Sequence, residues 1–183
     1  MKQNIKNDLY RYVGKESERF LTQLRYIFFV PGFQYIYFLR KTQHANFRLA
    51  RLFWATLLKF CSYKFAIQIP WQTKIGKGFR IVHWGHIVVN PGAVIGENFN
   101  ISQGCLIGNA QGKRCGTPII GDNVCMNANS IIIGGVKVGN NVLIAPGAFV
   151  NFDVPDNSIV IGNPGQIIKR ETSPTDKYIV YKI

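Results

Sequence analysis

A six-residue repeat of aliphatic side chains constrains the fold of this chain more than any other feature. The repeated positions are Ile69, Ile75, Ile81, Ile87, Ile95, Ile101, Ile107, Ile120, Met126, Ile132, Val138, Ile144 and Val150. This period fits neither an α-helix, with about 3.6 residues per turn, nor an isolated strand, which alternates about every second residue. It is typical of a solenoid in which six residues form one side of a triangular coil. The repeat therefore predicts a mainly β fold, a parallel β-helix of about four coils.

The N-terminal third of the chain follows a different pattern. Apolar residues recur there every three or four positions, which is the spacing of amphipathic helices. Helices are expected at residues 33–41 and 46–65, and Leu49, Leu52 and Phe53 lie on a side of the second that needs a partner to cover it. The predicted parts of the chain are an α-helical N-terminal region at 1–67, the β-helix at 68–168 and a C-terminal tail at 169–183.

Two interruptions of the repeat mark segments that leave the scaffold. The spacing between Ile87 and Ile95 exceeds six residues, and the insertion contains Pro91-Gly92. The spacing between Ile107 and Ile120 is longer still, so a polar loop is expected near 111–117. A loop on a rigid scaffold is a common place for binding residues.

Charge and aromatic residues are concentrated before the repeat. The chain has a formal net charge of +13, and residues 1–68 hold twelve Lys or Arg against three Asp or Glu, with 16 of the 24 aromatics. This composition suits an anionic surface such as lipid head groups. The alternative is a helical domain with an aromatic core and solvated cations. Nucleic acid is not an expected partner, because the chain has no zinc-finger spacing, aromatic RNA-binding strand or helix-turn-helix signal.

Cysteine usage and hydropathy indicate a cytoplasmic protein. Cys61, Cys105, Cys115 and Cys125 form no C-x-x-C pair, so reduced structural cysteines are expected and a metal site is not. The N-terminus lacks the apolar core of a signal peptide. The longest uncharged run, 26–39, is shorter than the roughly 20 residues that span a bilayer. Peripheral contact with the inner face of the membrane stays open.

Histidine is the residue type that indicates chemistry. His44 lies between helical segments and is expected at the surface. His83 and His86 occupy the third and sixth positions of the repeat unit that begins at Ile81. An imidazole titrates near neutral pH and can take the proton of an attacking hydroxyl. A purely structural role for His83 is the alternative.

Several stretches together resemble a known family. They are the segments at 75–83 (IGKGFRIVH), 87–89 (IVV), 94–96 (VIG), 118–124 (PIIGDNV), 154–157 (VPDN) and 162–169 (GNPGQIIK). This pattern resembles the serine acetyltransferase branch of the hexapeptide-repeat acyltransferases. The resemblance implies a left-handed parallel β-helix, a homotrimer, and acetyl-CoA bound in a groove between adjacent subunits. It also implies that His83 is the general base.

The chain departs from the serine-specific pattern at three positions. The acidic residue expected just before the base is Val82, the carboxylate expected fifteen residues before it is Gln68, and the histidine expected before Pro118 is Thr117. In these respects the chain is closer to the capsule and colanic-acid O-acetyltransferases. The leading expectation is therefore acetyl transfer to a sugar hydroxyl of a bacterial surface polysaccharide or its glycolipid-linked precursor. Serine O-acetyltransferase of cysteine biosynthesis and a non-catalytic trimeric scaffold are the alternatives.

The resemblance also suggests binding residues. His86, Trp84, Gln68, Lys113, Arg114 and Thr117 are weaker candidates for acceptor binding. Trp84 stacks on a sugar or packs at the trimer interface, and Lys113 and Arg114 contact an acidic ligand or are solvated loop residues. Candidates along the acetyl-CoA groove are Asn127, Ala128, Ala145, Pro146, Gly162, Lys169 and Arg170, the last two being otherwise a solvated basic end.

Overall fold

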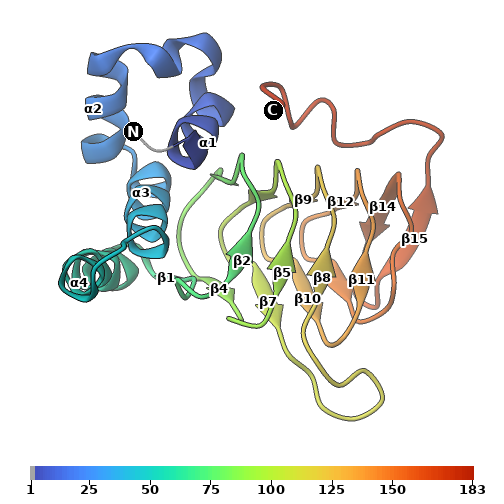
Figure 1. Cartoon of the computed structure of the whole chain (residues 1–183). Helices are drawn as coiled ribbons and strands as arrows, with labels where there is room; N and C mark the ends of the chain where they lie inside the picture. Colours follow the sequence, from blue (N-terminus) through green and yellow to red (C-terminus); the bar gives the residue numbers. More distant parts are fainter. Residues whose placement is uncertain (1–2) are drawn as a thin grey trace.

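The chain forms a layer of helices at one end of a β-helix (Figure 1). The structure is a computed structural model and describes residues 3–183. The helices are α1 (Gln3–Val13), a 3-10 helix (Gly14–Glu18), α2 (Phe20–Phe29), α3 (Pro31–Gln43) and α4 (Arg48–Phe65). The last two correspond to the helices expected at 33–41 and 46–65. Pro31-Gly32 begins α3, because proline is favoured in the first turn of a helix.

Short strands form three parallel sheets, one on each side of a prism. Sheet A holds β1 (Ile67–Gln68), β4 (Ile87–Val89), β7 (Leu106–Gly108), β10 (Ile131–Ile133) and β13 (Phe149–Val150). Sheet B holds β2 (Lys74–Ile75), β5 (Val94–Ile95), β8 (Ile119–Ile120) and β11 (Lys137–Val138). Sheet C holds β3 (Arg80–Ile81), β6 (Asn100–Ile101), β9 (Cys125–Met126), β12 (Leu143–Ile144), β14 (Ser158–Ile161) and β15 (Gln166–Lys169). The chain visits A, B and C in turn, and only β15 runs antiparallel to its neighbour.

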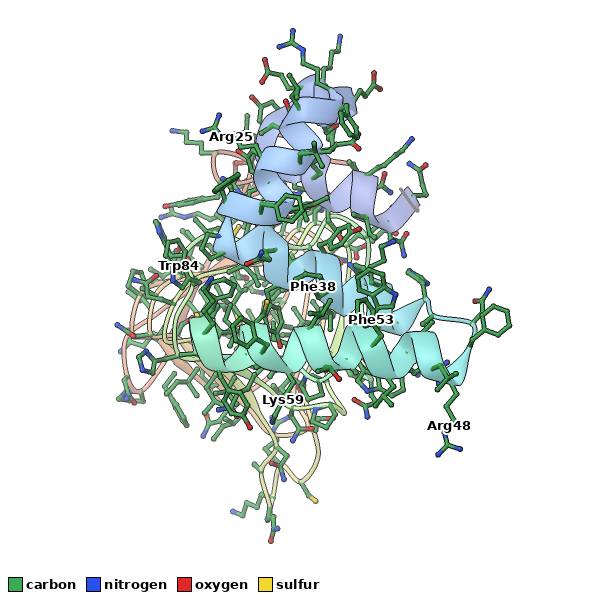
Figure 2. All side chains as sticks on the ribbon, turned by 90° about the vertical axis from the view of Figure 1, so that its left-hand side faces the viewer. Arg25, Phe38, Arg48, Phe53, Lys59 and Trp84 are labelled. Carbon is green, nitrogen blue, oxygen red and sulfur yellow. The ribbon has the colours of Figure 1, made fainter. Side chains whose placement is uncertain are left out.

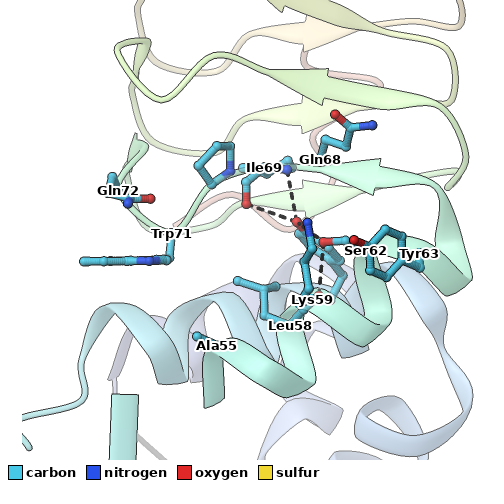
Figure 3. Close-up of a pocket in the computed structure, with 11 residues that line it drawn as sticks. Ala55, Leu58, Lys59, Ser62, Tyr63, Gln68, Ile69, Trp71 and Gln72 are labelled. Atoms are coloured by element: carbon cyan, nitrogen blue, oxygen red, sulfur yellow. Dashed lines mark hydrogen bonds between the residues drawn. The ribbon is translucent and has the colours of Figure 1, made fainter. Parts of the chain in front are cut away.

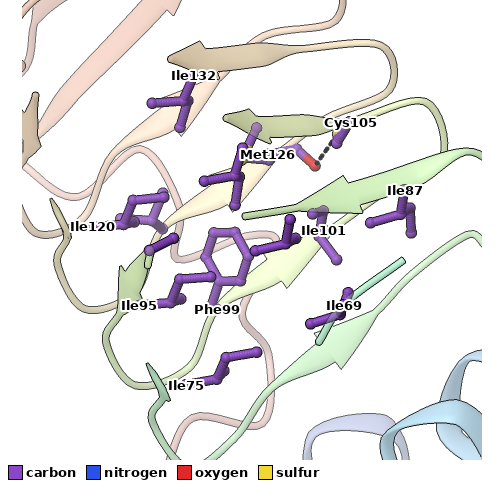
Figure 4. Packing of buried hydrophobic residues seen from close by; sticks show 14 of the residues in the cluster. Ile69, Ile75, Ile87, Ile95, Phe99, Ile101, Cys105, Ile120, Met126 and Ile132 are labelled. Carbon is purple, nitrogen blue, oxygen red and sulfur yellow. Dashed lines mark hydrogen bonds between the residues drawn. The ribbon is translucent and has the colours of Figure 1, made fainter. Parts of the chain in front are cut away.

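The repeated aliphatic side chains fill the interior of this prism. All thirteen repeat positions are buried, from Ile69 in the first coil to Val150 in the last. Figure 4 shows several of them stacked on their equivalents in the next coil. Each buried side chain of this kind contributes about 1.5–3 kcal/mol by leaving water. The coil predicted from the six-residue period is confirmed.

A ladder of asparagines stabilises the corner between sheets B and C. Asn98, Asn123, Asn141 and Asn157 occupy equivalent positions in successive coils, and all four have φ between 53° and 57°. Each side-chain amide donates to the next, over 3.2, 3.0 and 2.9 Å. Asparagine tolerates this left-handed conformation better than other residues with a side chain, because its short amide bonds locally.

Replacing Asn123 with alanine should lower the free energy of unfolding by about 1–3 kcal/mol. The substitution removes two rungs of the ladder and leaves an unfavourable φ of 57°. Urea denaturation measures the loss. Asn123→Gly removes the same hydrogen bonds without the conformational strain, so it should cost less. An equal cost for both variants would contradict the role of the backbone conformation.

Buried polar contacts attach the helices to the first coil. Asp8 of α1 and Arg40 of α3 form an ion pair with an Nε–Oδ2 distance of 2.8 Å, and both side chains are almost completely buried. Arg40 also donates to the Ile75 carbonyl over 2.8 Å, and the Phe79 N–H donates to Asp8 over 2.8 Å. Gly32 allows a close approach, because a Cβ there would lie 2.8 Å from the Ile81 carbonyl oxygen. The helical layer and the β-helix are thus one packed unit.

The tail beyond β15 turns back along the outside of sheet C toward α1 (Figure 1). Ile179 packs in a buried cluster with Cys125 and Leu143. The Asn100 side chain donates to the Tyr178 carbonyl over 3.1 Å. The Asn98 amide exchanges two hydrogen bonds with the backbone of Ile183, of 2.9 and 3.0 Å. The tail therefore covers sheet C and connects the end of the chain to its first coils.

One apolar side of α4 remains uncovered. Leu58, Cys61 and Phe65 pack inward, whereas Leu49, Leu52, Phe53 and Phe60 are exposed. The aromatic residues before the repeat therefore divide between a buried set, which includes Phe33 and Tyr35, and an exposed set. Among residues 3–183 no helix has the length and apolarity needed to cross a membrane.

Candidate active site

His83 lies in the turn that joins β3 of sheet C to β4 of sheet A. The side chain is exposed, and no hydrogen bond or ion pair holds the imidazole within the part of the chain that the structure describes. Gly85 and His86 in the same turn have φ of 113° and 52°. The turn neighbours the end of α4, because the Ile87 N–H donates to the Ala66 carbonyl over 3.1 Å. An exposed imidazole at a scaffold corner is available to a substrate.

Corresponding turns of later coils stack on the turn of His83. The Gly104 N–H donates to the Gly85 carbonyl, the Asn129 N–H to Gln103 and the Gly147 N–H to Ala128, each over 2.9 Å. This column, which we call the C–A edge, consists of the turns at 82–86, 102–105, 127–130, 145–148 and 162–165. It contains the predicted groove residues Asn127, Ala128, Ala145, Pro146 and Gly162. The structure thus brings His83 and these five onto one edge of the prism.

Two predicted cofactor residues lie away from that edge. β15 runs antiparallel to β14 and pairs Lys169 with Ser158, at the start of β14. The Arg170 N–H donates to the Asn157 carbonyl over 2.8 Å. Both residues are therefore at the corner between sheets B and C, across the width of sheet C from Gly162. A single chain does not bring them together with the groove residues.

The inserted loop leaves a third corner, between sheets A and B. An antiparallel bridge between Ala110 and Gly116 closes the loop into a hairpin. Arg114 forms an exposed ion pair with Asp153 at 3.0 Å, and Thr117 donates to the Gly92 carbonyl over 2.9 Å. Lys113 is exposed. These residues lie on the opposite side of sheet A from His83, so within one chain they do not share its site.

Gln68 of β1 lines a pocket between α4 and the first coil (Figure 3). The volume of this pocket is about 530 Å³. No hydrogen bond joins Gln68 to His83 in the described residues. Lys59 and Tyr63 of α4 line the same pocket, and Lys59 lies 4.7 Å from the centre of the Tyr63 ring. Neither residue was predicted from the sequence, because helical spacing does not show that this side of α4 faces the first coil.

The remaining acceptor candidates flank His83. Trp84 is 52% exposed and projects from the surface in Figure 2. His86 is also exposed. Both lie in the same turn of the C–A edge as His83.

The cysteines of this region are structural in character. Cys105 and Cys125 are buried, and burial raises the pKa of the Cys105 thiol and raises that of Cys125 to about 12. A high pKa disfavours the nucleophilic thiolate. Cys61 is also buried, whereas Cys115 is exposed on the inserted loop. Within residues 3–183 no group of three or more His, Cys, Asp or Glu side chains is placed to hold a metal ion.

Comparison with known proteins agrees with this architecture. Residues 117–151 match the model of the family described as bacterial transferase hexapeptide (six repeats). The matched residues lie in the later coils of the β-helix and include β8 to β13. The serine acetyltransferase of Staphylococcus epidermidis is 40% identical over 108 residues, which are 57% of this chain and 50% of the relative. The serine acetyltransferase 4 of Arabidopsis thaliana is 38% identical over 106 residues, which are 57% of this chain and 30% of the relative. The chain thus spans about half the length, or less, of the curated relatives that it matches.

Solved structures show the same relationship over more of the chain. The crystal structure of Neisseria gonorrhoeae serine acetyltransferase in complex with serine superposes with a TM-score of 0.71 and 26% identity, covering 88% of this chain and 66% of that one. The match extends into the helices. It confirms the predicted fold class, which is a mainly β, left-handed parallel β-helix preceded by a helical N-terminal region.

The comparisons correct the expected acceptor. Gln68, Val82 and Thr117 led to the expectation of polysaccharide O-acetylation and of the capsule and colanic-acid branch. The curated relatives at 38–40% identity and the solved neighbours are serine acetyltransferases, so that expectation is wrong. Three residues near the site led to that expectation, whereas the similarity to serine acetyltransferases extends over more than 100 residues.

Proposed function

We propose that this hexapeptide-repeat protein is an acetyl-CoA-dependent serine O-acetyltransferase. The observation that carries the proposal is the C–A edge, where His83 and the five groove residues lie in one column of turns. The similarity to serine acetyltransferases in both sequence and structure supports the choice of donor and acceptor.

His83 acts as the general base in this proposal. A serine hydroxyl is a weak nucleophile near neutral pH, and a positioned imidazole takes its proton as the oxygen attacks the acetyl carbon of the thioester. A carbon–oxygen bond forms and the carbon–sulfur bond breaks. The proton then returns from His83 to the departing thiolate. No covalent enzyme intermediate is required.

The proposed donor site follows the C–A edge. Asn127, Ala128, Ala145 and Pro146 offer small side chains and backbone groups along which an extended pantetheine arm can lie. The N–H groups of Gly104, Asn129 and Gly147 are already engaged in stacking the turns, so they are not free to bind it. These residues therefore line a path from His83 toward the C-terminal end of the β-helix.

A second copy of the chain completes the proposed site. Thr117, Lys113 and Arg114 lie on the corner between sheets A and B, and Lys169 and Arg170 on the corner between B and C. Only a neighbouring subunit can bring either corner to the His83 edge. A homotrimer with sites between adjacent subunits meets this requirement, because each subunit then contributes two different edges.

The acceptor is proposed to bind beside His83, with the Gln68 pocket one coil below. Lys59 lines that pocket and supplies a cation for a carboxylate. The uncharged Gln68, Val82 and Thr117 provide no anion for the serine ammonium. We therefore expect weak ground-state binding of serine, expressed as a high KM.

Incubation of the protein with acetyl-CoA should release coenzyme A only when L-serine is present. The released thiol is measured by its reaction with a disulfide reagent, and L-alanine, which lacks the hydroxyl, is the matched control and should release none. Thiol release with other hydroxyl acceptors but not with serine would contradict the proposal. Failure to bind acetyl-CoA in calorimetry would instead support the scaffold alternative.

A further inference from the structure

An exposed apolar stripe runs along α4. It consists of Leu49, Leu52, Phe53 and Phe60, which are between 57% and 81% exposed. Their spacing of three, four and seven residues places them on one side of a helix, away from the buried side chains of Leu58, Cys61 and Phe65. Scattered apolar residues on a surface are ordinary, but a contiguous group of this size marks an interaction site.

A second set of exposed apolar side chains lies on α2, which is separated from α4 by α3 (Figure 1). These side chains are Phe20, Leu21, Phe28 and Phe29. In Figure 2, α4 crosses the front of the molecule with α2 above it, and the β-helix lies behind both. The labelled Phe53 on α4 and Arg25 beside α2 are visible from this same side. The two exposed sets are therefore at the same end of the molecule, on either side of α3.

The charges around the stripe all have one sign. No Asp or Glu occurs between Glu18 and Glu97, a segment that contains α2, α3 and α4. Helical spacing places Arg48 along one border of the stripe and Lys64 along the other. The four ion pairs of the described residues involve neither of these two, nor Arg25. The border cations are thus available to an anionic partner.

Charge also distinguishes between two possible partners of this surface, a second copy of the chain and an anionic bilayer. Pairing this surface with the same surface of a second copy would bring cations against cations with no carboxylate between them, which is unfavourable. An anionic bilayer offers both an apolar layer for the Leu and Phe side chains and phosphates for the Lys and Arg side chains. An amphipathic helix of this composition lies in the plane of the membrane interface.

We propose that α2 and α4 form a docking surface for anionic phospholipid bilayers, with the α4 stripe inserted among the head groups. This surface is separate from the C–A edge, so the proposal stands independently of the proposed acetyl transfer. It assigns a role to the apolar side of α4 that the fold leaves without a partner.

Cosedimentation with vesicles tests the docking surface. The full chain should bind vesicles of phosphatidylcholine containing phosphatidylglycerol, should bind pure phosphatidylcholine much more weakly, and should dissociate as salt is raised. The double variant Leu52→Ser/Phe53→Ser should weaken binding by at least about tenfold, because two inserted side chains are lost. Ile119→Ser/Val180→Ser removes two exposed apolar side chains elsewhere and should leave binding unchanged.

Charge reversal provides a second pair of variants. Arg48→Glu/Lys64→Glu should weaken binding by roughly 30-fold or more, since each basic residue near the surface contributes about fivefold. Lys113→Glu/Lys137→Glu makes the same change in net charge at exposed positions away from the helices and should have little effect. Absence of binding to anionic vesicles would overturn the proposal. So would Leu52→Ser/Phe53→Ser changing the oligomeric state in light scattering without changing vesicle binding, since the stripe would then be a protein interface.

Discussion

Substitution of His83 by alanine should lower the turnover of acetyl transfer by about 10²–10⁴-fold, which is the usual contribution of a general base. The fold should be unaffected, because the side chain is exposed and makes no hydrogen bond in the described part of the chain. Steady-state release of coenzyme A measures the loss. An unchanged thermal unfolding temperature and an unchanged oligomeric state establish that the variant is folded.

Two further measurements separate a catalytic from a structural role of His83. Added imidazole should restore part of the turnover of His83→Ala, because the vacated position is open to solvent. His44→Gln replaces a histidine at the end of α3, away from the C–A edge, and should retain turnover. Near-normal turnover of His83→Ala would remove His83 from the mechanism even if the protein proved to acetylate serine.

Replacing Asp8 with alanine should lower the free energy of unfolding by about 3–5 kcal/mol, the usual cost of removing one partner from a buried ion pair. Asp8 is fully buried and Arg40 nearly so. The Asp8 carboxylate accepts from Arg40 Nε over 2.8 Å and from the Phe79 N–H over 2.8 Å. The variant leaves the Arg40 charge without its counter-ion in a site that water does not reach. Urea denaturation measures the effect.

The exposed pair Glu16–Arg19 is the matched control for Asp8. Its side chains are more than half exposed, and Glu16→Ala should change stability by less than about 1 kcal/mol. The double variant Asp8→Leu/Arg40→Met should recover part of the loss, because it removes the unpaired charge. A small effect of Asp8→Ala, similar to that of Glu16→Ala, would show that the pair does not anchor the helices.

Much of the β-helix could be predicted because its sequence pattern is local. All thirteen repeated aliphatic positions face the interior, and the two interruptions occur where turns or loops leave the coil. The edge that carries His83 and Asn127 also follows from the period, since residues in equivalent turns must stack. Once the coil is known, the position of a residue within its repeat unit places it in space.

Features that depend on non-local contacts could not be predicted in this way. The pairing of Asp8 with Arg40 and the return of the tail over sheet C join residues far apart in the chain. The periodicity of α4 shows two apolar sides but not which of them packs inward. For the same reason Lys59 and Tyr63 were not recognised as pocket residues. The position of Lys169 and Arg170 at the corner between sheets B and C depends on the antiparallel pairing of β15 with β14, which the repeat does not predict.

The returning tail changes how the β-helix can come apart. In a solenoid each coil contacts only its neighbours, so coils can detach one after another from an exposed end. Here the segment that follows β15 reaches back to Asn98 and Asn100 in the early coils, and Tyr181 meets Tyr10 of α1 with ring centres 6.1 Å apart. Detaching the last coil therefore also loosens the first. The C-terminal tail joins the two ends of the β-helix, so both ends should unfold in a single cooperative transition.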